Sequence, residues 1–360
     1  SPARSGWGMV VILFGKTSCW ADVDMSTFVA SNSLGFRVIG KSADDRLGTS
    51  VASAGDVNGD GYADVIIGAY KAFLSGRTNA GMVYVLFGHS TASSFPDIDL
   101  NTLVFPSLAG FWILGPTALG NSGSVVTGGF DLNHDGYSDV AVGSSKSGHV
   151  YIIFGNSTAN GAFNPRDLAD LVSVNRDWGF SIDGLPAGDI WEDLSLSSAG
   201  DINADGIDDL ILGSGISSIS GRANCGIVFL LRGHDSSYQF NGFSVSAWTS
   251  TKGYRVYGYS ASDRLGSGVA GEVDVNGDGI DDVALGAQYG DGASSDVGVV
   301  YVIFGKASGW VDIDVSLGAY AGFVVLGAAS GNNLGNSVAL ARDFNGDGTG
   351  DLILGAHSAD

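Results

Sequence analysis

Short apolar segments separated by polar turns run through the whole chain, and none of them is long enough for a typical helix. They are rich in β-branched and aromatic residues and are bounded by Gly, Asn, Asp or Ser. This pattern is typical of β-strands. The sequence therefore predicts an all-β protein.

Four kinds of segment, which we name A, B, C and D, recur five times in the same order. A segments of small alternating residues are 47–55, 122–130, 192–200, 265–273 and 334–342; apolar B segments are 65–69, 140–144, 210–214, 283–287 and 352–356. C segments, most ending in Phe-Gly, are 9–15, 82–88, 149–155, 227–233 and 299–305; glycine-bracketed D segments are 35–40, 110–115, 179–184, 253–258 and 322–327. Four short strands per repeat predict the blades of a β-propeller, since stacked solenoids usually have repeats of about 20–45 residues.

The order of the segments suggests a closed ring. The chain starts with C and D segments and finishes with A and B segments. An arbitrary excerpt of a longer array is the alternative, but it would seldom hold a whole number of repeats. We therefore expect residues 1–360 to form one propeller domain of about five four-stranded antiparallel blades. Strands 9–14 and 36–39 should join strands 336–341 and 352–355 in one sheet, so that N-terminal strands complete the last blade.

A nine-residue loop, Asp-x-Asn-x-Asp-Gly-x-x-Asp, stands between each A and B segment, at 56–64, 131–139, 201–209, 274–282 and 343–351. The glycine at position 6 permits a sharp turn, so the oxygens at positions 1, 3, 5 and 9 can converge. The side-chain donors are Asp56, Asn58, Asp60, Asp64, Asp131, Asn133, Asp135, Asp139, Asp201, Asn203, Asp205, Asp209, Asp274, Asn276, Asp278, Asp282, Asp343, Asn345, Asp347 and Asp351. Main-chain carbonyls at position 7 belong to Tyr62, Tyr137, Ile207, Ile280 and Thr349.

Hard oxygen donors in this number suit Ca²⁺, whereas Mg²⁺ requires a stricter octahedron. No His or Cys stands at a ligand position, which disfavours zinc and copper. Position 12 of the first loop is Ile67, inside a predicted strand, so the loops are not EF-hands. Metal-free turns rich in Asp and Asn are the alternative, which five intact copies disfavour. We expect about five Ca²⁺ ions.

The acidic balance bears on partners. The net charge is −21, which disfavours nucleic acid and anionic membrane surfaces, and five Ca²⁺ would reduce it to −11. No apolar run approaches the roughly 18 residues of a membrane helix, so we expect no direct membrane insertion. Cys19 and Cys225 occupy non-equivalent places in the repeat, and we expect both thiols to be unpaired.

Leu-Gly-x-Ser-Val-Ala, Asp-x-Asn-x-Asp-Gly, an apolar Gly-Ala and Val-Tyr-Val-x-Phe-Gly follow one another in this chain. This series resembles the FG-GAP repeat of integrin α-subunit propellers and related bacterial and eukaryotic surface proteins. The resemblance covers essentially the whole chain and implies an extracellular, calcium-bound β-propeller for adhesion or ligand recognition. Integrin propellers have seven blades against the five counted here, and leucines replace the Phe of several Phe-Gly pairs, so the resemblance does not extend to a particular partner.

Catalytic motifs are missing from the sequence. It contains neither Gly-x-Ser-x-Gly nor His-Glu-x-x-His, and its five histidines are scattered. We therefore expect no enzymatic activity. One alternative function is a carbohydrate-binding lectin, for which Trp178, Trp191 and Trp248 would be the stacking residues; the other is a structural spacer in a surface protein or fibre.

Alternating strand direction predicts the recognition face. The A-to-B calcium loops should share one end of the propeller, and the B-to-C and D-to-A loops should share the other. The B-to-C loops vary most in length, and variable loops on a rigid scaffold are where binding usually occurs. We expect a protein or glycan ligand on the face opposite the calcium loops. The first candidate contacts are Tyr70, Arg77, Arg222 and Tyr289.

Overall fold

The computed structural model describes residues 6–17, 22–90, 93–103, 109–157, 163–173, 177–187, 194–292 and 294–359. These residues are almost entirely strands and turns, with one short helix, α1 (Ala169–Ser173), and two 3₁₀ turns, η2 (Val245–Ala247) and η3 (Val315–Leu317). The prediction of an all-β fold is confirmed. The predictions made for Cys19 and Trp191 fall outside the described residues.

Four sheets correspond to the complete predicted blades, each containing its A, B, C and D strand in that order. Blade 1 has β3 (Leu47–Gly55), β4 (Asp64–Ala69), β5 (Met82–Leu86) and β7 (Gly110–Leu114). Blade 2 has β8 (Ser122–Phe130), β9 (Asp139–Ser144), β10 (His149–Ile153) and β12 (Gly179–Asp183). Blade 3 has β13 (Ser195–Gly200), β14 (Asp209–Ser214), β15 (Ile227–Leu231) and β17 (Gly253–Tyr257). Blade 4 has β18 (Leu265–Val273), β19 (Asp282–Ala287), β20 (Val299–Ile303) and β22 (Gly322–Leu326).

Two incomplete blades flank these four. The C and D strands β1 (Met9–Leu13) and β2 (Gly35–Ile39) pair with each other before blade 1. The A and B strands β23 (Leu334–Ala341) and β24 (Asp351–Ala356) form a two-stranded sheet after blade 4. All neighbouring strands within a blade pair antiparallel, as predicted.

A fifth, two-residue strand, which the sequence pattern did not predict, lies on the outer edge of most sheets. These strands are β6 (Ile98–Asp99) on β2, β11 (Arg166–Asp167) on β7, β16 (Phe243–Ser244) on β12 and β21 (Ile313–Asp314) on β17. Each pairs parallel to a D strand and comes from the C-to-D connection of the next blade. The connection therefore links consecutive blades.

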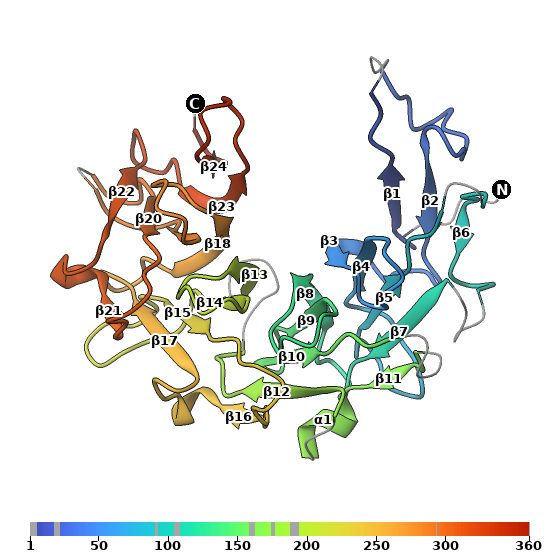
Figure 1. Cartoon of the computed structure of the whole chain (residues 1–360), viewed down its shortest axis with the longest axis horizontal. Coiled ribbons are helices and arrows are strands. Elements are labelled where there is room, and N and C mark those ends of the chain that lie inside the picture. Colours follow the sequence, from blue (N-terminus) through green and yellow to red (C-terminus); the bar gives the residue numbers. More distant parts are fainter. Residues whose placement is uncertain are drawn as a thin grey trace.

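The blades surround a common centre, with the A strands innermost (Figure 1). Successive A strands β3, β8, β13, β18 and β23 contact one another. The glycine of the B strand permits this close approach, because a Cβ on Gly68 would lie 2.1 Å from the carbonyl oxygen of Gly123 in the next blade. At Gly286 the corresponding distance, to the carbonyl oxygen of Gly335, would be 1.9 Å. The Gly-Ala motif of each repeat is thus a packing requirement between blades.

Apolar clusters fill the space between neighbouring blades. One cluster joins Ile66 and Val83 of blade 1 to Val142 and Tyr151 of blade 2, all of them buried. The B and C strands of complete blades are buried on both faces, which explains their nearly continuous apolar sequences. Beside β23 and β24 the cluster shrinks to three buried residues, Ala284, Val300 and Val302. The core is therefore thinnest beside this incomplete blade.

The predicted closure of the ring is wrong for this structure. Strands β1 and β2 form a sheet with β6, whereas β23 and β24 form a separate sheet. The two incomplete blades lie on either side of an opening in the arc (Figure 1). The reason is geometric: each blade is rotated from its neighbour by a turn that its packing fixes, and these turns do not complete a circle over the blades present. A repeat length read from the sequence carries no information about that angle.

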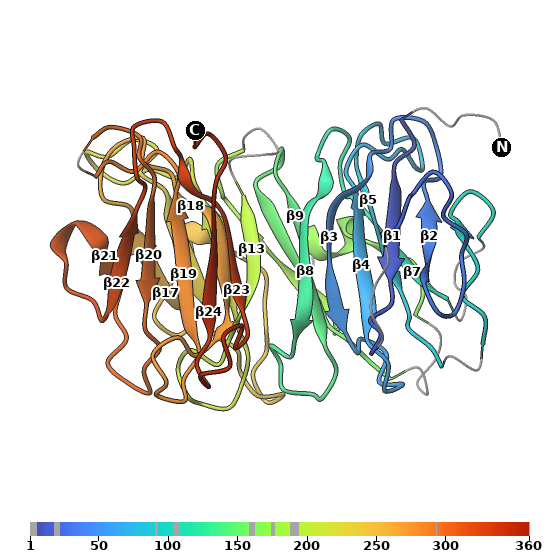
Figure 2. The ribbon, with the colours of Figure 1, turned by 90° about the horizontal axis from the view of Figure 1, so that it is seen from above.

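The two ends of the blades carry different loops, as the alternating strand direction predicts. Strands β3 and β8 run toward the same edge of the arc, where the Asp-rich loops follow them (Figure 2). The B strand β24 runs the other way, so the chain reaches its C-terminus at the opposite edge (Figure 2). The Asp-rich loops and the variable B-to-C loops therefore lie on opposite faces.

Candidate functional site

The Asp-rich loops share one tight turn built by their own side chains. In the first loop, the Asp56 carboxylate accepts the N–H groups of Asp60 at 3.0 Å and Gly61 at 2.8 Å. The Asn58 side-chain oxygen also accepts the Asp60 N–H, at 2.9 Å, and the Asp60 carboxylate accepts that of Tyr62, at 2.9 Å. The bonds from position 1 to the N–H groups of positions 5 and 6 recur in all five loops. The loop sequence thus encodes its own turn.

The glycine at position 6 has the conformation that the sequence analysis required. Its φ angle is 86° in Gly61 and 91° in Gly348, the left-handed region that other residues rarely adopt. A Cβ at either position would meet no neighbouring atom within 4 Å. The requirement for glycine here comes from the backbone angle and not from lack of space.

The aspartate at position 9 ties each loop to its blade. The Asp64 carboxylate accepts the N–H of Val57 at 2.9 Å and that of Gly88, which follows the C strand, at 2.9 Å. The corresponding glycine bonds are Gly155 to Asp139, Gly233 to Asp209 and Gly305 to Asp282, at 2.8–2.9 Å. All four carboxylates are buried. The glycine of the Phe-Gly pair is therefore a hydrogen-bond donor that closes the loop against the sheet.

Burial makes these carboxylates unusually weak acids. It raises the pKa of Asp64 to about 7, that of Asp209 to about 8 and that of Asp282 to about 6. Burial also raises the pKa of Asp139 well above its usual range. Backbone N–H donors oppose the rise, while the other acids of the loop add to it. A cation at the loop would relieve this penalty.

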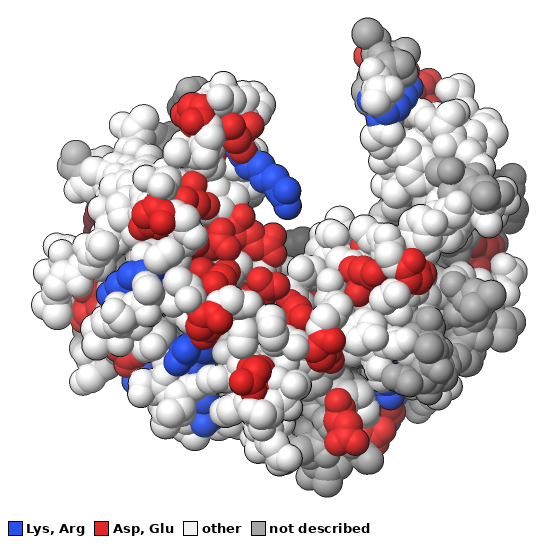
Figure 3. Space-filling view, in the orientation of Figure 1, with Lys and Arg blue, Asp and Glu red and all other residues white. Residues whose placement is uncertain are grey.

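The donor set of each loop fits a calcium ion. Three carboxylates, one amide oxygen and a main-chain carbonyl meet within nine residues, and each oxygen that accepts an N–H keeps a second lone pair. Among the described residues, no three His, Cys, Asp or Glu side chains form a closed metal cage by themselves. The ion would therefore depend on the Asn amide and the carbonyl as well as on the acids. Acidic side chains gather around the centre of this face (Figure 3).

The third loop differs from the other complete loops. Arg232 occupies the place of the Phe in the Phe-Gly pair, and its guanidinium lies 3.0 Å from the Asp205 carboxylate at position 5. The Asn203 amide donates to Asp209 at 2.8 Å, whereas Asn58 and Asn276 donate to the acids at position 5. An arginine thus supplies part of the positive charge that this loop requires.

The candidate recognition residues have structural contacts. Arg77 forms a two-pronged ion pair with Asp167 of blade 2, at 2.7 and 2.8 Å, and Arg222 pairs in the same way with Asp314 of blade 4. Both guanidiniums also donate to a carbonyl at the end of their own blade's D strand. Tyr70 is buried in the core. The arginines therefore clasp consecutive blades together, a role that the sequence analysis did not foresee.

Tyr289 and the candidate lectin residues are also packed against neighbours. The Arg264 guanidinium lies over the Tyr289 ring, 5.2 Å from its centre, and that of Arg166 lies over the Trp178 ring at 4.8 Å. Trp248 is buried and packs against Phe229. Only Tyr289 and Trp178 of this group keep partly exposed rings in the described residues.

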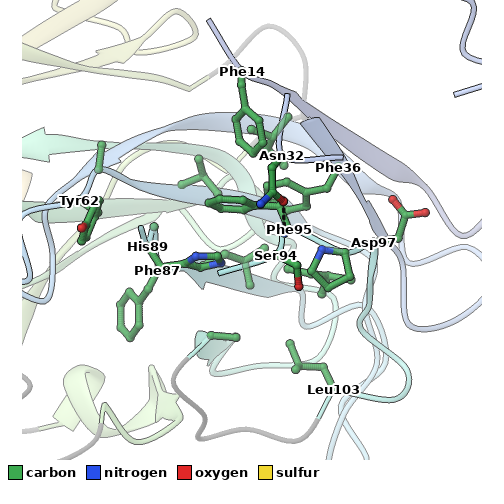
Figure 4. A pocket seen from close by; sticks show the side chains of 18 of the residues that line it. Phe14, Asn32, Phe36, Tyr62, Phe87, His89, Ser94, Phe95, Asp97 and Leu103 are labelled. Carbon is green, nitrogen blue, oxygen red and sulfur yellow. Dashed lines mark hydrogen bonds between the residues drawn. The ribbon is translucent and has the colours of Figure 1, made fainter. Parts of the chain in front are cut away.

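A cavity of about 780 Å³ lies beside the N-terminal incomplete blade and was not predicted from the sequence. Phe14, Phe36, Phe87 and Phe95 line it, and His89 stacks on Phe95 with ring centres 3.9 Å apart (Figure 4). His234 stacks on Tyr238 in the same way. The prediction that these two histidines share a packing position in the repeat is confirmed.

Comparison with known proteins agrees with the repeat pattern. The family model of the FG-GAP repeat matches residues 47–86, 122–153 and 334–360. Integrin alpha-PS2 of Drosophila melanogaster is 30% identical over 66% of this chain and 15% of its own length. Human phosphatidylinositol-glycan-specific phospholipase D is 27% identical over 61% of this chain and 25% of its own length. Integrin alpha pat-2 of Caenorhabditis elegans is 34% identical over 41% of this chain and 11% of its own length.

The chain spans no more than about a quarter of the length of these relatives. The matched family residues include three B strands and the A-to-B loops at 56–64, 131–139 and 343–351. No helix among the described residues is long and apolar enough to cross a membrane. The chain therefore carries FG-GAP repeats and has the blade architecture of an integrin-α-like propeller.

Proposed function

We propose that this chain is a calcium-stabilised β-propeller module that recognises a protein or glycan ligand and has no catalytic activity of its own. The observation that carries the proposal is the set of five loops with one hydrogen-bonded turn and one oxygen donor set. Folding brings three carboxylates together in each loop, and in four loops it buries one of them. A divalent cation would offset the repulsion that this arrangement creates.

Calcium would act here as a structural ion. The side chains at positions 1, 3, 5 and 9, with the carbonyl at position 7, would hold it in each loop. Its charge would favour the ionised form of the buried carboxylate at position 9. Each loop then gains stability only in the folded state, because the unfolded chain does not gather these oxygens.

An extracellular or cell-surface location is part of the proposal. Loops of this kind, partly open to solvent, suit the millimolar calcium that extracellular modules use. The integrin α relatives support a role in adhesion, and the phospholipase relative shows by its name that similar repeats also occur in an enzyme. Since the chain matches only a quarter of that enzyme, its activity does not transfer.

The ligand would bind on the face opposite the calcium loops. The B-to-C loops there differ most between blades, while the ion pairs of Arg77 and Arg222 hold their bases in place. Tyr289, Trp178 and the loop at 288–297 are the remaining accessible elements of the predicted site. A lectin and a structural spacer remain alternatives.

Protein and glycan arrays test the proposal. The calcium-loaded chain should bind a restricted set of protein or glycan probes, and Tyr289→Ala should weaken that binding without changing the melting temperature. Selective binding to glycans with loss in Trp178→Ala would favour the lectin. Binding to neither array, together with calcium-dependent stability, would favour the spacer and contradict the recognition role.

A further inference from the structure

The outer edge of β22 differs from that of every other D strand in the structure. Strands β2, β7, β12 and β17 each pair in parallel with a two-residue strand from the next blade. In the described residues, β22 pairs only with β20. Unpaired edge strands are natural docking sites for another strand.

An aromatic cluster beside β22 is also incomplete. In three blades, the Phe after the C strand packs on the Phe of the D strand, with ring centres 5.9–6.0 Å apart. A third ring, from the segment that leads into the short docked strand, completes each cluster: Phe95 on Phe36, Phe163 on Phe111 and Phe240 on Phe180. Phe304 and Phe323 form the same pair at 6.1 Å, and no third ring among the described residues joins them.

The exposure of β22 shows what the missing segment would cover. Phe323 is 39% exposed, whereas its equivalents Phe36, Phe111 and Phe180 are at most 7% exposed. The neighbouring side chains Val324 and Leu326 are 42% and 55% exposed. An apolar strip on a sheet edge is thus left open to solvent in a blade that is otherwise well buried.

Charge pairing indicates which segments each D strand accepts. Arg37 of β2 faces Asp97 of the docked segment at 2.5 Å, and Arg255 of β17 faces Asp312 at 2.5 Å. Where the D strand has Trp112 or Ser181 in place of arginine, the docked segment has a neutral residue, Pro165 or Gly242. In all four docked pairs, an acid two residues after the aromatic ring occurs only opposite an arginine.

A second position, four residues after the ring, follows the same rule. Arg77 and Arg222 of the B-to-C loops pair with Asp167 and Asp314 there. The short B-to-C loop of blade 2, residues 145–147, has no arginine, and the docked segment has Ser244. The acids of a docked segment therefore match the arginines of the blade that receives it.

The blade of β22 has neither arginine. Val324 stands where Arg37 and Arg255 stand, and the B-to-C loop at 288–298 contains Asp291 and Asp296 but no basic residue. This loop reaches the edge, because a Cβ on Gly292 would lie 3.7 Å from Leu326. A docked segment with acids at the two positions would leave both carboxylates unpaired beside other acids, which is unfavourable.

We propose that the outer edge of β22 binds an extended segment of a partner propeller repeat, one with an aromatic residue followed two and four positions later by neutral residues. The aromatic ring would complete the cluster of Phe304 and Phe323, and the following residues would pair with β22 and cover Val324 and Leu326. The chain's own equivalent sequence, Trp-Ala-Asp-Val-Asp at 20–24, has acids at both positions. Neither this segment nor the same segment of a second copy is therefore the occupant.

Two labelled peptides test the proposal on the full chain. One copies residues 305–317, with Trp310, Asp312 and Asp314; the other carries Asp312→Asn and Asp314→Asn and is otherwise identical. Fluorescence anisotropy should show the neutral peptide binding at least about tenfold more tightly, because no unpaired carboxylate is then buried. Hydrogen exchange should slow at residues 322–326 when the neutral peptide is bound.

Variants of the edge sharpen the test. Val324→Arg should raise affinity for a peptide with Asp312 retained and Asp314→Asn, and Leu326→Ser should weaken every peptide. Both side chains are partly exposed, so the fold should survive. Binding of neither peptide, equal binding of both or protection elsewhere would overturn the proposal. If a peptide copying residues 15–27 binds as tightly as the neutral peptide, the occupant is a second copy and the proposal is also wrong.

Discussion

The loop at 343–351 and the four loops of the complete blades have the same sequence pattern but different surroundings. In both cases the aspartate at position 1 accepts the N–H groups of positions 5 and 6. In the complete blades, however, the aspartate at position 9 is buried and accepts the N–H of a glycine after the C strand. The equivalent Asp351 is half-buried and accepts the N–H of Phe344, an exposed neighbour within its own loop.

This difference separates two contributions to the site. The turn forms from nine local residues, whereas the burial of the carboxylate requires a C strand packed beside it. The unusual acid strength of Asp64, Asp209 and Asp282 belongs to the second contribution. A loop sequence alone therefore specifies the ligands, and the complete blade specifies their electrostatic environment.

Removing the carboxylate at position 9 should have the largest effect, and a very unequal one in the two kinds of loop. Asp64→Ala leaves the buried N–H groups of Val57 and Gly88 without an acceptor, and should lower the free energy of unfolding by about 3 kcal/mol or more. Asp351→Ala exposes its donor to water and should lower it by about 1 kcal/mol. Denaturant unfolding in calcium measures both. Equal losses would contradict the distinction between the loops.

The pH dependence of stability should change sign when calcium is removed. Without a cation, the folded-state pKa values of Asp282, Asp64 and Asp209, about 6, 7 and 8, lie above the unfolded value near 3.8. The folded protein then holds more protons, so its stability is greatest below pH 4 for these groups and falls as pH rises to about 8. The slope should reach about 1.4 kcal/mol per pH unit for each titrating carboxylate.

Denaturant unfolding in excess chelator at several pH values measures this slope. Saturating calcium should abolish the loss, because the ion favours the ionised carboxylates. Asp64→Asn, which cannot ionise, is the matched variant and should flatten the slope near pH 7. If stability in chelator rises steadily from pH 5 to pH 8, the buried carboxylates do not behave as described.

The ion pairs between blades should contribute a smaller amount. Arg222→Ala removes the two-pronged contact with Asp314, whose pKa the guanidinium lowers to about 2, and should lower the free energy of unfolding by about 1–2 kcal/mol. A double-mutant cycle with Asp314→Ala should return most of that energy as coupling. No coupling, with loss of ligand binding at unchanged stability, would instead make Arg222 a recognition residue.

Glycine replacement should affect the two kinds of loop equally. Gly206→Ala and Gly348→Ala place a Cβ on residues with φ of 85° and 91°, and neither Cβ would meet a neighbouring atom. Each should lower the free energy of unfolding by about 1 kcal/mol, since only the local backbone is strained. Thermal unfolding with calcium present measures both. A much larger loss at Gly206 would show that the turn also depends on its blade.

The sequence predicted most of what is local in this fold. The B, C and D strands begin and end within two residues of the predicted segments, because their apolar runs and bounding glycines are local signals. The loop turn was predicted for the same reason: Gly61 and its equivalents permit only one kind of bend. The two-residue strands were missed because they are too short to show a period, although an aromatic residue followed by Asp-Ile-Asp marks two of them, at 97–99 and 312–314.

What the sequence did not predict depends on contacts between blades. Arg77 and Arg222 stand in variable loops, which suggested ligand contacts, but their partners lie about 90 residues away in the next blade. Ring closure depends on the rotation between blades, which the repeat length does not contain. Charge matching between Arg37 and Asp97, or Arg255 and Asp312, was visible in the sequence only once the docked strands were known.

A calcium titration of the metal-free chain tests the central claim most directly. Calorimetry should show saturable binding of about five ions per chain, with a melting temperature that rises on saturation by an amount equivalent to about 2.7 kcal/mol per site at a hundredfold excess of ion over its dissociation constant. Asp343→Ala should remove one ion and little stability, whereas Asp56→Ala should remove one ion and much more. No binding heat and an unchanged melting temperature in excess chelator would contradict the account.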